Sequence, residues 1–311
     1  MDLDNLQLVV VGCLGHSGSR LLVNILEDNG IYMGRYRSTI GEDEVIWSKL
    51  LADPSLNEAY IKFINGVDKT SIKELLKKTF SQYQSSILNK PGFLTNLKVH
   101  FRQRYTNSTT YIKNPPSELL GYGFKNATGS LLIIEAFFEL LNELQLEQNT
   151  CFIHLSRELG NWLESGYKKG TRGVPRYIYS PRGNFKDEAI RYLWFNSTNE
   201  IIKKNDGKEW NIAEASITEI EENREFIESL LWANSNKRML EIGKKASHFL
   251  HLRYNEILLN PENTAETLST FFNRKFTINR KLDKTRITEY KPEIIPELAK
   301  EISEKLGYKL E

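Results

Sequence analysis

The feature that most constrains the fold of this chain is a strand, a glycine-rich turn and a helix in direct succession near its beginning. The run LQLVVV at 6–11 is continuously apolar, which is typical of a strand covered on both faces of a sheet. Glycines and small polar residues follow at 12–19. The segment RLLVNILEDNG at 20–30 then places apolar residues on one helix face and stops at Asn29 and Gly30. Because a buried strand that turns directly into a helix is the unit of strand–helix folds, this segment predicts an α/β fold.

Three further apolar runs repeat the same order of strand and helix. Each is followed by a helical pattern, and helices between strands favour a parallel sheet with right-handed crossovers. We therefore predict a parallel central sheet flanked by helices. The three runs are LGYGFK at 120–125, CFIHLS at 151–156 and SHFLHLR at 247–253.

Two long stretches separate these units and have helical character. Residues 42–90 contain helical patterns, and residues 171–245 begin as a polar loop and continue as helices. A length of 311 residues allows two domains or one large α/β domain. We expect a single domain over 1–311 with both stretches as helical insertions, since insertions at the loop end of a parallel sheet commonly build the substrate pocket.

The composition excludes several classes of protein. The net charge of +2, from 42 Lys and Arg against 40 Asp and Glu, is too balanced to indicate nucleic acid as a partner. No stretch approaches 18 consecutive apolar residues, so we expect no membrane-spanning helix. Cys13 and Cys151 lie in apolar runs and form no CxxC pair, which predicts buried reduced thiols and a cytoplasmic location. The opening MDLDNLQLVVVG lacks a basic region and is expected to be a strand rather than a signal peptide.

The glycine-rich turn has the chemistry of an anion site. Successive backbone N–H groups in such a turn form a concave nest, and the following helix adds the positive end of its dipole. Hydroxyl and cationic side chains in the same segment can add bonds to a phosphate or sulfate. The alternative, a plain strand–helix turn that uses glycine for a positive φ, stays open. The candidate anion-binding residues are Gly15, His16, Ser17, Gly18, Ser19 and Arg20.

Two common nucleotide-binding motifs do not fit this turn. A Walker A loop requires G-x-x-x-x-G-K-[ST], but Gly12 and Gly18 are too far apart and no Lys follows. The Rossmann motif G-x-G-x-x-G is also absent, because the glycines at 12, 15 and 18 are evenly spaced.

The segment GHSGSRLL instead resembles the 5′-phosphosulfate-binding loop of the sulfotransferases, which reads Arg or Lys, Ser, Gly, Thr, Thr or Ser, and then apolar residues. Ser17 and Gly18 match this loop, and Ser19 stands for its first Thr. His16 replaces the cation, and Arg20 replaces the second hydroxyl. The resemblance implies a P-loop NTPase-like sulfotransferase fold that binds 3′-phosphoadenosine-5′-phosphosulfate (PAPS).

Three other segments resemble sulfotransferase motifs in the same chain order. In CFIHLSRELGNWLESGY, Arg157 ends a strand and Ser165 follows eight residues later, as in the family's 3′-phosphate-binding segment. An Arg at the carboxyl end of a strand can grip a phosphate with its planar fork. In YGFKNATG, Lys125 matches a Lys-Asp-Pro or Lys-Asn-Pro strand end, although Ala127 departs from the Pro. In LRYNEILLNPENTAETLSTFF, Tyr254 belongs to a segment that resembles Tyr-Glu-Asp-Leu followed by Pro-Glu.

The resemblance implies transfer of a sulfuryl group from PAPS to a hydroxyl or amine of a saccharide or another small molecule, as in bacterial and glycan-type members, with no metal. In-line displacement of this kind depends on positioning and on cations around the transferred group. Lys125 and His16 are the candidate catalytic cations, with Arg20 beside them, and Glu42 is the candidate base that takes the proton of the acceptor. The alternatives for the base are Glu44 and His100.

Two other functions stay open on the sequence alone. A nucleotide or small-molecule kinase could use the same sheet, but it would need a phosphate-binding Lys in the loop and an acidic Mg²⁺ ligand. A non-catalytic nucleotide-binding protein is the second alternative, because of the departures at His16, Arg20 and Ala127. Several aromatic residues of the insertions suit either stacking on a sugar ring or ordinary packing: Trp47, Tyr60, Tyr177, Tyr179 and Trp194.

The remaining histidines and the last residues carry no predicted function. His154, His248 and His251 fall in predicted strands and are expected to be structural. Residues 273–311 match no motif, and the sequence does not indicate an oligomeric state.

Overall fold

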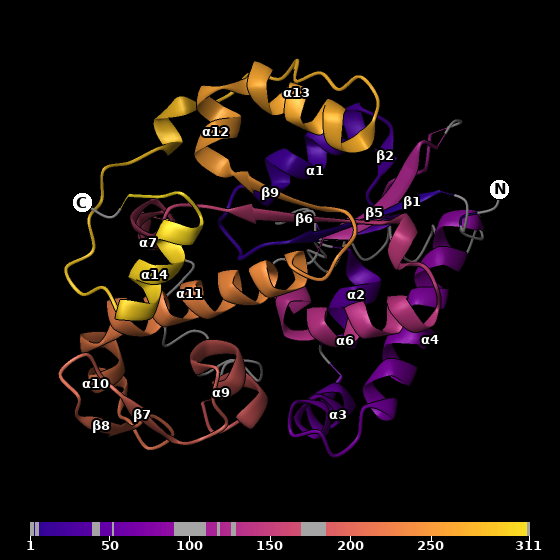
Figure 1. The fold of residues 1–311 in the computed structure, drawn as a ribbon. Coiled ribbons are helices and arrows are strands. Elements are labelled where there is room, and N and C mark those ends of the chain that lie inside the picture. The colour runs from indigo at the N-terminus through magenta and orange to yellow at the C-terminus, as the bar shows by residue number, and fades with distance from the viewer. Residues whose placement is uncertain are drawn as a thin grey trace, which may run out of the picture.

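A five-stranded parallel sheet forms the centre of the structure (Figure 1). The structure is a computed structural model that describes residues 3, 6–38, 44–51, 53–89, 110–116, 119–125, 129–168 and 185–309. The strands are β1 (Gln7–Gly12), β2 (Ile31–Tyr32), β5 (Gly121–Lys125), β6 (Thr150–Ser156) and β9 (Phe249–Arg253). Their spatial order is β2-β5-β1-β6-β9, which places the strand of the glycine-rich turn in the middle.

The four predicted strands are confirmed within one or two residues at each end. The fifth strand, β2, follows the first helix directly and has only two residues, too few to form a recognisable apolar pattern. The side chains of β1 alternate between two apolar cores, with Val10 in one core and Val9 and Val11 in the other. This double coverage explains the continuous apolar run, because neither face of the strand meets water.

Helices cover both faces of the sheet, as predicted (Figure 1). The α-helices among the described residues are α1 (Ser19–Asp28), α2 (Val45–Leu50), α3 (Pro54–Ile64), α4 (Thr70–Leu88), α6 (Gly129–Glu143), α7 (Leu159–Lys168), α9 (Glu188–Phe195), α10 (Ile217–Glu222), α11 (Arg224–Gly243), α12 (Tyr254–Leu259), α13 (Pro261–Phe272) and α14 (Glu297–Lys305). Helices α1, α12 and α13 lie on one face, and α2, α6 and α11 lie on the other.

The described parts of both predicted insertions are largely helical. Helices α2, α3 and α4 belong to the stretch 42–90, and α9, α10 and α11 belong to 171–245. The sequence did not predict two short antiparallel strand pairs, because a strand of three residues is too short to show an alternation of apolar and polar residues. They are β3 (Tyr36–Ser38) with β4 (Thr110–Ile112), and β7 (Ile201–Lys203) with β8 (Glu209–Asn211).

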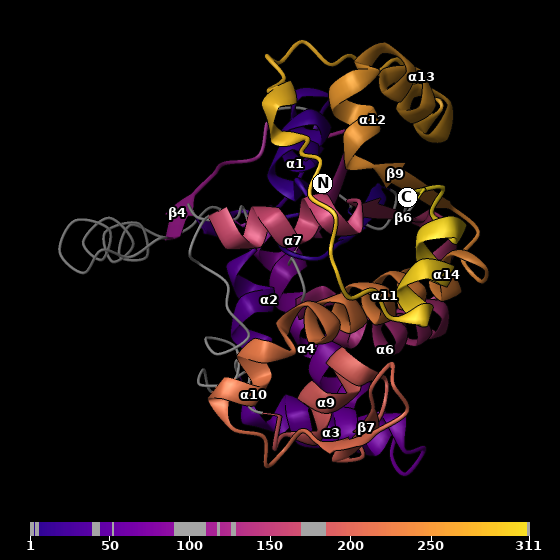
Figure 2. The same cartoon turned by 90° about the vertical axis from the view of Figure 1, so that its left-hand side faces the viewer.

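Residues 283–295, called here the C-terminal strap, run from the layer of α12 and α13 past α7 to α14 (Figure 2). Asn161 on α7 fixes the strap, because its Oδ1 accepts from the backbone N–H of Thr288 at 2.5 Å. The strap passes so close to Gly160 that a Cβ there would lie 1.9 Å from the carbonyl oxygen of Tyr290. A segment for which the sequence predicted no role is therefore packed against the helix that follows Arg157.

Several expectations about single residues can be compared with the described part of the chain. Both cysteines, Cys13 and Cys151, are buried, as predicted. His154 is buried, but His248 is exposed and precedes β9, so its expected place in a core strand was wrong. No helix among the described residues has the length and apolar character to cross a membrane.

Candidate functional site

The strands of the sheet end side by side. Val11 is opposite Lys125, Gly12 is opposite His154, and Ser156 is opposite Arg253. The glycine-rich turn, Lys125, Arg157 and Tyr254 therefore lie along one edge of the sheet. This is the carboxyl edge, where open α/β sheets bind their ligands.

The turn between β1 and α1 has two residues in the left-handed region. Gly18 caps α1 with φ 84°, and His16 has φ 67°, which is unusual for a residue with a Cβ. The side chains of Ser17 and Ser19 are buried, whereas Arg20 is exposed. Left-handed residues within such a turn are the backbone arrangement from which anion nests are built.

Gly18 is required for a second reason, which is the close approach of Tyr254. A Cβ at Gly18 would lie 2.0 Å from the Tyr254 ring, so any side chain there would collide with it. Tyr254 opens α12 and is buried. Its ring also faces the Arg157 guanidinium at 4.8 Å. The predicted residue Tyr254 thus packs between the turn and Arg157.

Arg157 connects three segments of the chain. Its Nη1 donates to the carbonyl of His16 at 3.0 Å, and its Nη2 donates to the carbonyl of Arg286 in the C-terminal strap at 2.5 Å. The side chain is 5% exposed, and burial lowers the pKa of the guanidinium. Ser165 lies half-buried on the following helix, α7. The fork that the sequence predicts to hold a phosphate is therefore held by two backbone carbonyls in this structure.

The strap is the part of the site that sequence reasoning missed. It contributes the carbonyl of Arg286 to Arg157, and the Arg286 side chain interacts with Tyr254. A contact through a backbone carbonyl places no demand on residue type. No sequence signal for that contact was therefore available in 273–311.

Glu44, an alternative for the base, is buried at the start of α2. Its Oε2 accepts from the backbone N–H groups of Ile46 at 2.7 Å and Trp47 at 3.3 Å. Its Oε1 is buried and makes no hydrogen bond with any described residue. Burial raises the pKa of the Glu44 carboxyl to about 7, although the capping bonds and the charge of Arg37 act in the opposite direction. A carboxyl group with a pKa near neutrality is suited to proton transfer.

Two contacts hold Glu44 against the end of β5. Its backbone N–H donates to the carbonyl of Lys125 at 3.1 Å. The ring of Trp47 stacks on that of Phe124 with centroids 4.3 Å apart, which anchors α2 on the strand. The Lys125 side chain is 1% exposed. The structure thus brings a candidate cation and a candidate base to the same strand end.

Other candidates fall outside this site or outside the described residues. Trp47, Tyr60 and Trp194 are buried in the core, so ordinary packing accounts for them. The residues that lie outside the described part of the chain are Glu42, His100, Asn126, Ala127, Tyr177 and Tyr179.

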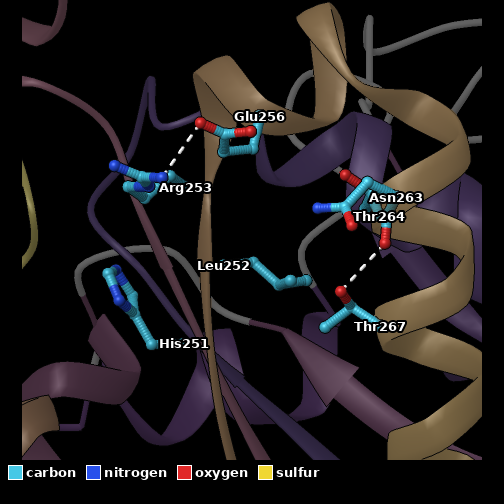
Figure 3. A pocket seen from close by; sticks show the side chains of 7 residues that line it. All are labelled: His251, Leu252, Arg253, Glu256, Asn263, Thr264 and Thr267. Carbon is cyan, nitrogen blue, oxygen red and sulfur yellow. Dashed lines mark hydrogen bonds and ion pairs between the residues drawn. The ribbon is translucent and has the colours of Figure 1, made fainter.

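A cavity of about 160 Å³ lies beside the outer strand β9 and contains none of the predicted site residues (Figure 3). Among its lining residues, Arg253 already donates to the carbonyl of Gly307 at 2.8 Å and to Glu256 at 2.9 Å. Thr267 donates to the carbonyl of Asn263 at 2.9 Å. The cavity thus brings together none of the motif residues, and we keep the carboxyl edge as the candidate site.

Comparison with known proteins identifies the fold. No family model and no curated protein matches the chain. The sulfotransferase domain from the curacin biosynthetic pathway is similar in structure, with a TM-score of 0.50 and 12% identity over 98% of this chain and 99% of that chain. The sulfotransferase domain from the Synechococcus PCC 7002 olefin synthase has a TM-score of 0.48 and 14% identity over 99% and 96%. Together with the parallel sheet and its flanking helices, the first of these similarities shows that the chain has the sulfotransferase fold.

Proposed function

We propose that this protein is a sulfotransferase that moves the sulfuryl group of PAPS to a hydroxyl or amine of a saccharide or small-molecule acceptor. One observation carries the proposal. The anion loop, residues 12–19, is joined to Arg157 by the bond to the His16 carbonyl, and Glu44 is joined to Lys125 by a backbone bond. Two candidate anion-binding elements, the loop and Arg157, therefore lie at the same sheet edge as a candidate cation, Lys125, and a candidate base, Glu44.

The nucleotide would lie along this edge between the loop and Arg157. The loop amides, Ser17 and Ser19 would bind the 5′-phosphosulfate, with Gly15, His16 and Arg20 beside it. Arg157 and Ser165 would bind the 3′-phosphate. The Arg157 guanidinium uses two of its five N–H donors on the carbonyls of His16 and Arg286, and its buried Nε makes no hydrogen bond with a described residue, so donors remain for a phosphate.

The reaction would be an in-line displacement at sulfur. The acceptor oxygen forms a bond to sulfur, the bond from sulfur to the bridging phosphate oxygen breaks, and adenosine 3′,5′-bisphosphate leaves with the electron pair. Lys125 and His16 would offset the charge on the sulfuryl and bridging oxygens. The proton of the acceptor hydroxyl would pass to a carboxylate.

We assign that carboxylate to Glu44 in preference to Glu42. Glu44 directly precedes α2, adjoins Lys125, and has a pKa raised to about 7 by burial. A base with a pKa near the working pH transfers protons most effectively. Glu42 stays the alternative, and the variants Glu44→Gln and Glu42→Gln separate the two by their loss of turnover.

The first test is binding of adenosine 3′,5′-bisphosphate followed by transfer of labelled sulfate from PAPS to a panel of saccharide and phenolic acceptors. A ligand at 100 times its dissociation constant adds about 2.7 kcal/mol of stability, which a thermal melt detects. Transfer without Mg²⁺ distinguishes the reaction from that of a kinase. The absence of any melting shift at millimolar nucleotide would refute the proposal, and binding without transfer to any acceptor would indicate a nucleotide-binding protein instead.

A further inference from the structure

We propose that Trp162 is a positioning residue for the anion loop, an inference that rests on the proposed function. Trp162 lies on α7 and is 3% exposed. Its indole Nε1–H donates to the carbonyl of Gly15 at 2.8 Å. Helix α7, which directly follows Arg157, therefore contacts the glycine-rich turn through a second side chain.

The bond determines the orientation of the peptide that follows Gly15. In a planar trans peptide the C=O and the next N–H point in opposite directions. With the Gly15 carbonyl held toward α7, the N–H of His16 is turned away from α7. Arg157 holds the next carbonyl, that of His16, at 3.0 Å. Two successive carbonyls of the loop are thus held by residues outside it. The N–H of the second peptide, that of Ser17, donates to the carbonyl of Leu14 at 3.2 Å. The N–H of His16 is therefore the amide that the Trp162 bond orients, as one member of an anion nest.

The backbone of His16 explains why the loop needs such support. Its φ of 67° lies in the left-handed region, which is unfavourable for a residue with a Cβ. Backbone conformations of this kind persist where the surrounding contacts hold them. The bonds from Trp162 and Arg157 flank the strained residue on both of its peptide units. Trp162 therefore maintains the anion-binding conformation without touching the nucleotide.

The test compares two nucleotides on the variant Trp162→Phe, which keeps an aromatic ring and removes the N–H donor. Adenosine 3′,5′-bisphosphate uses the loop, whereas adenosine 3′-phosphate has no 5′ group to place there. Loss of one hydrogen bond that orients the loop should weaken the bisphosphate about three- to tenfold, measured by titration calorimetry, and leave adenosine 3′-phosphate unchanged. The value of kcat/KM for PAPS should fall by a similar factor.

Trp210→Phe is the matched control, because Trp210 is also buried but lies in the β7–β8 hairpin, away from the sheet (Figure 1). It should alter neither affinity. Trp162→Tyr is the second variant if Trp162→Phe does not fold, with the melting temperature of the ligand-free protein as the check on folding.

Equal affinity of wild-type protein and Trp162→Phe for the bisphosphate would overturn the inference and leave the proposed function intact. Equal losses for both nucleotides would also overturn it, since they would indicate a general effect on the fold. Failure of the wild-type protein to bind the bisphosphate would overturn the proposed function itself, together with this inference.

Discussion

Replacing Glu44 by Gln should stabilise the protein at neutral and alkaline pH while it removes the proposed base. Glu44 has a pKa of about 7 in the folded chain against an ordinary 4.5, so the folded state keeps a proton that the unfolded state loses between these values. The contribution of Glu44 to wild-type stability therefore falls as the pH rises from 4.5 to 7 and stays level above 7. The difference between the two pKa values corresponds to about 3 kcal/mol of unfolding free energy, at about 1.4 kcal/mol per pH unit.

Gln has no such dependence, because its amide does not ionise and its oxygen can still accept the capping bonds of Ile46 and Trp47. Chemical denaturation at pH 5 and pH 8 measures the effect. The difference in unfolding free energy between Glu44→Gln and wild type should grow in favour of the variant by up to about 3 kcal/mol across that interval.

Asp53→Asn is the matched control. Asp53 caps α3 in the same way but is exposed, and bonds from Ser55 lower its pKa. Its variant should gain nothing between pH 5 and pH 8. Parallel stability curves for Glu44→Gln and wild type would refute the assignment of a buried, proton-holding carboxyl. In Glu44→Gln, the rate of sulfuryl transfer should also fall by about 10²–10⁴-fold while nucleotide binding persists.

Three further outcomes are expected. Arg157→Ala should weaken both adenosine 3′,5′-bisphosphate and adenosine 5′-phosphosulfate in calorimetry, with the larger loss for the former, because Arg157 also holds the carbonyl of His16. Gly18→Ala should lower the melting temperature, since its φ of 84° and the ring of Tyr254 leave no room for a Cβ. Burial lowers the pKa of His154 to about 3, so this residue should make the protein less stable as the pH falls below 6.5. His154→Gln should therefore lose less unfolding free energy than wild type between pH 7 and pH 4.5, as measured by chemical denaturation.

Local patterns explain how much of the site was predictable. Lys125 and Arg157 each follow a short apolar run, and parallel strands end at a common edge, so their placement at one edge needed only the strand assignments. The choice between Glu42 and Glu44 was different. Both lie in one acidic run, and only the start of α2 at Val45 makes Glu44 the buried cap. Helix boundaries within a charged segment depend on packing, here that of Trp47 on Phe124.

The sequence by itself determined the α/β class, the parallel sheet and the location of the glycine-rich turn, because apolar runs, helical periodicity and glycine spacing are local properties of the chain. Only the tertiary structure decided what surrounds those residues. Side-chain hydrogen bonds to backbone carbonyls join segments that are distant in sequence: Arg157 donates to His16 and Arg286, and Trp162 donates to Gly15. Every residue has a carbonyl group, so such contacts leave no trace in residue type and arise only when the folded chain brings the segments together.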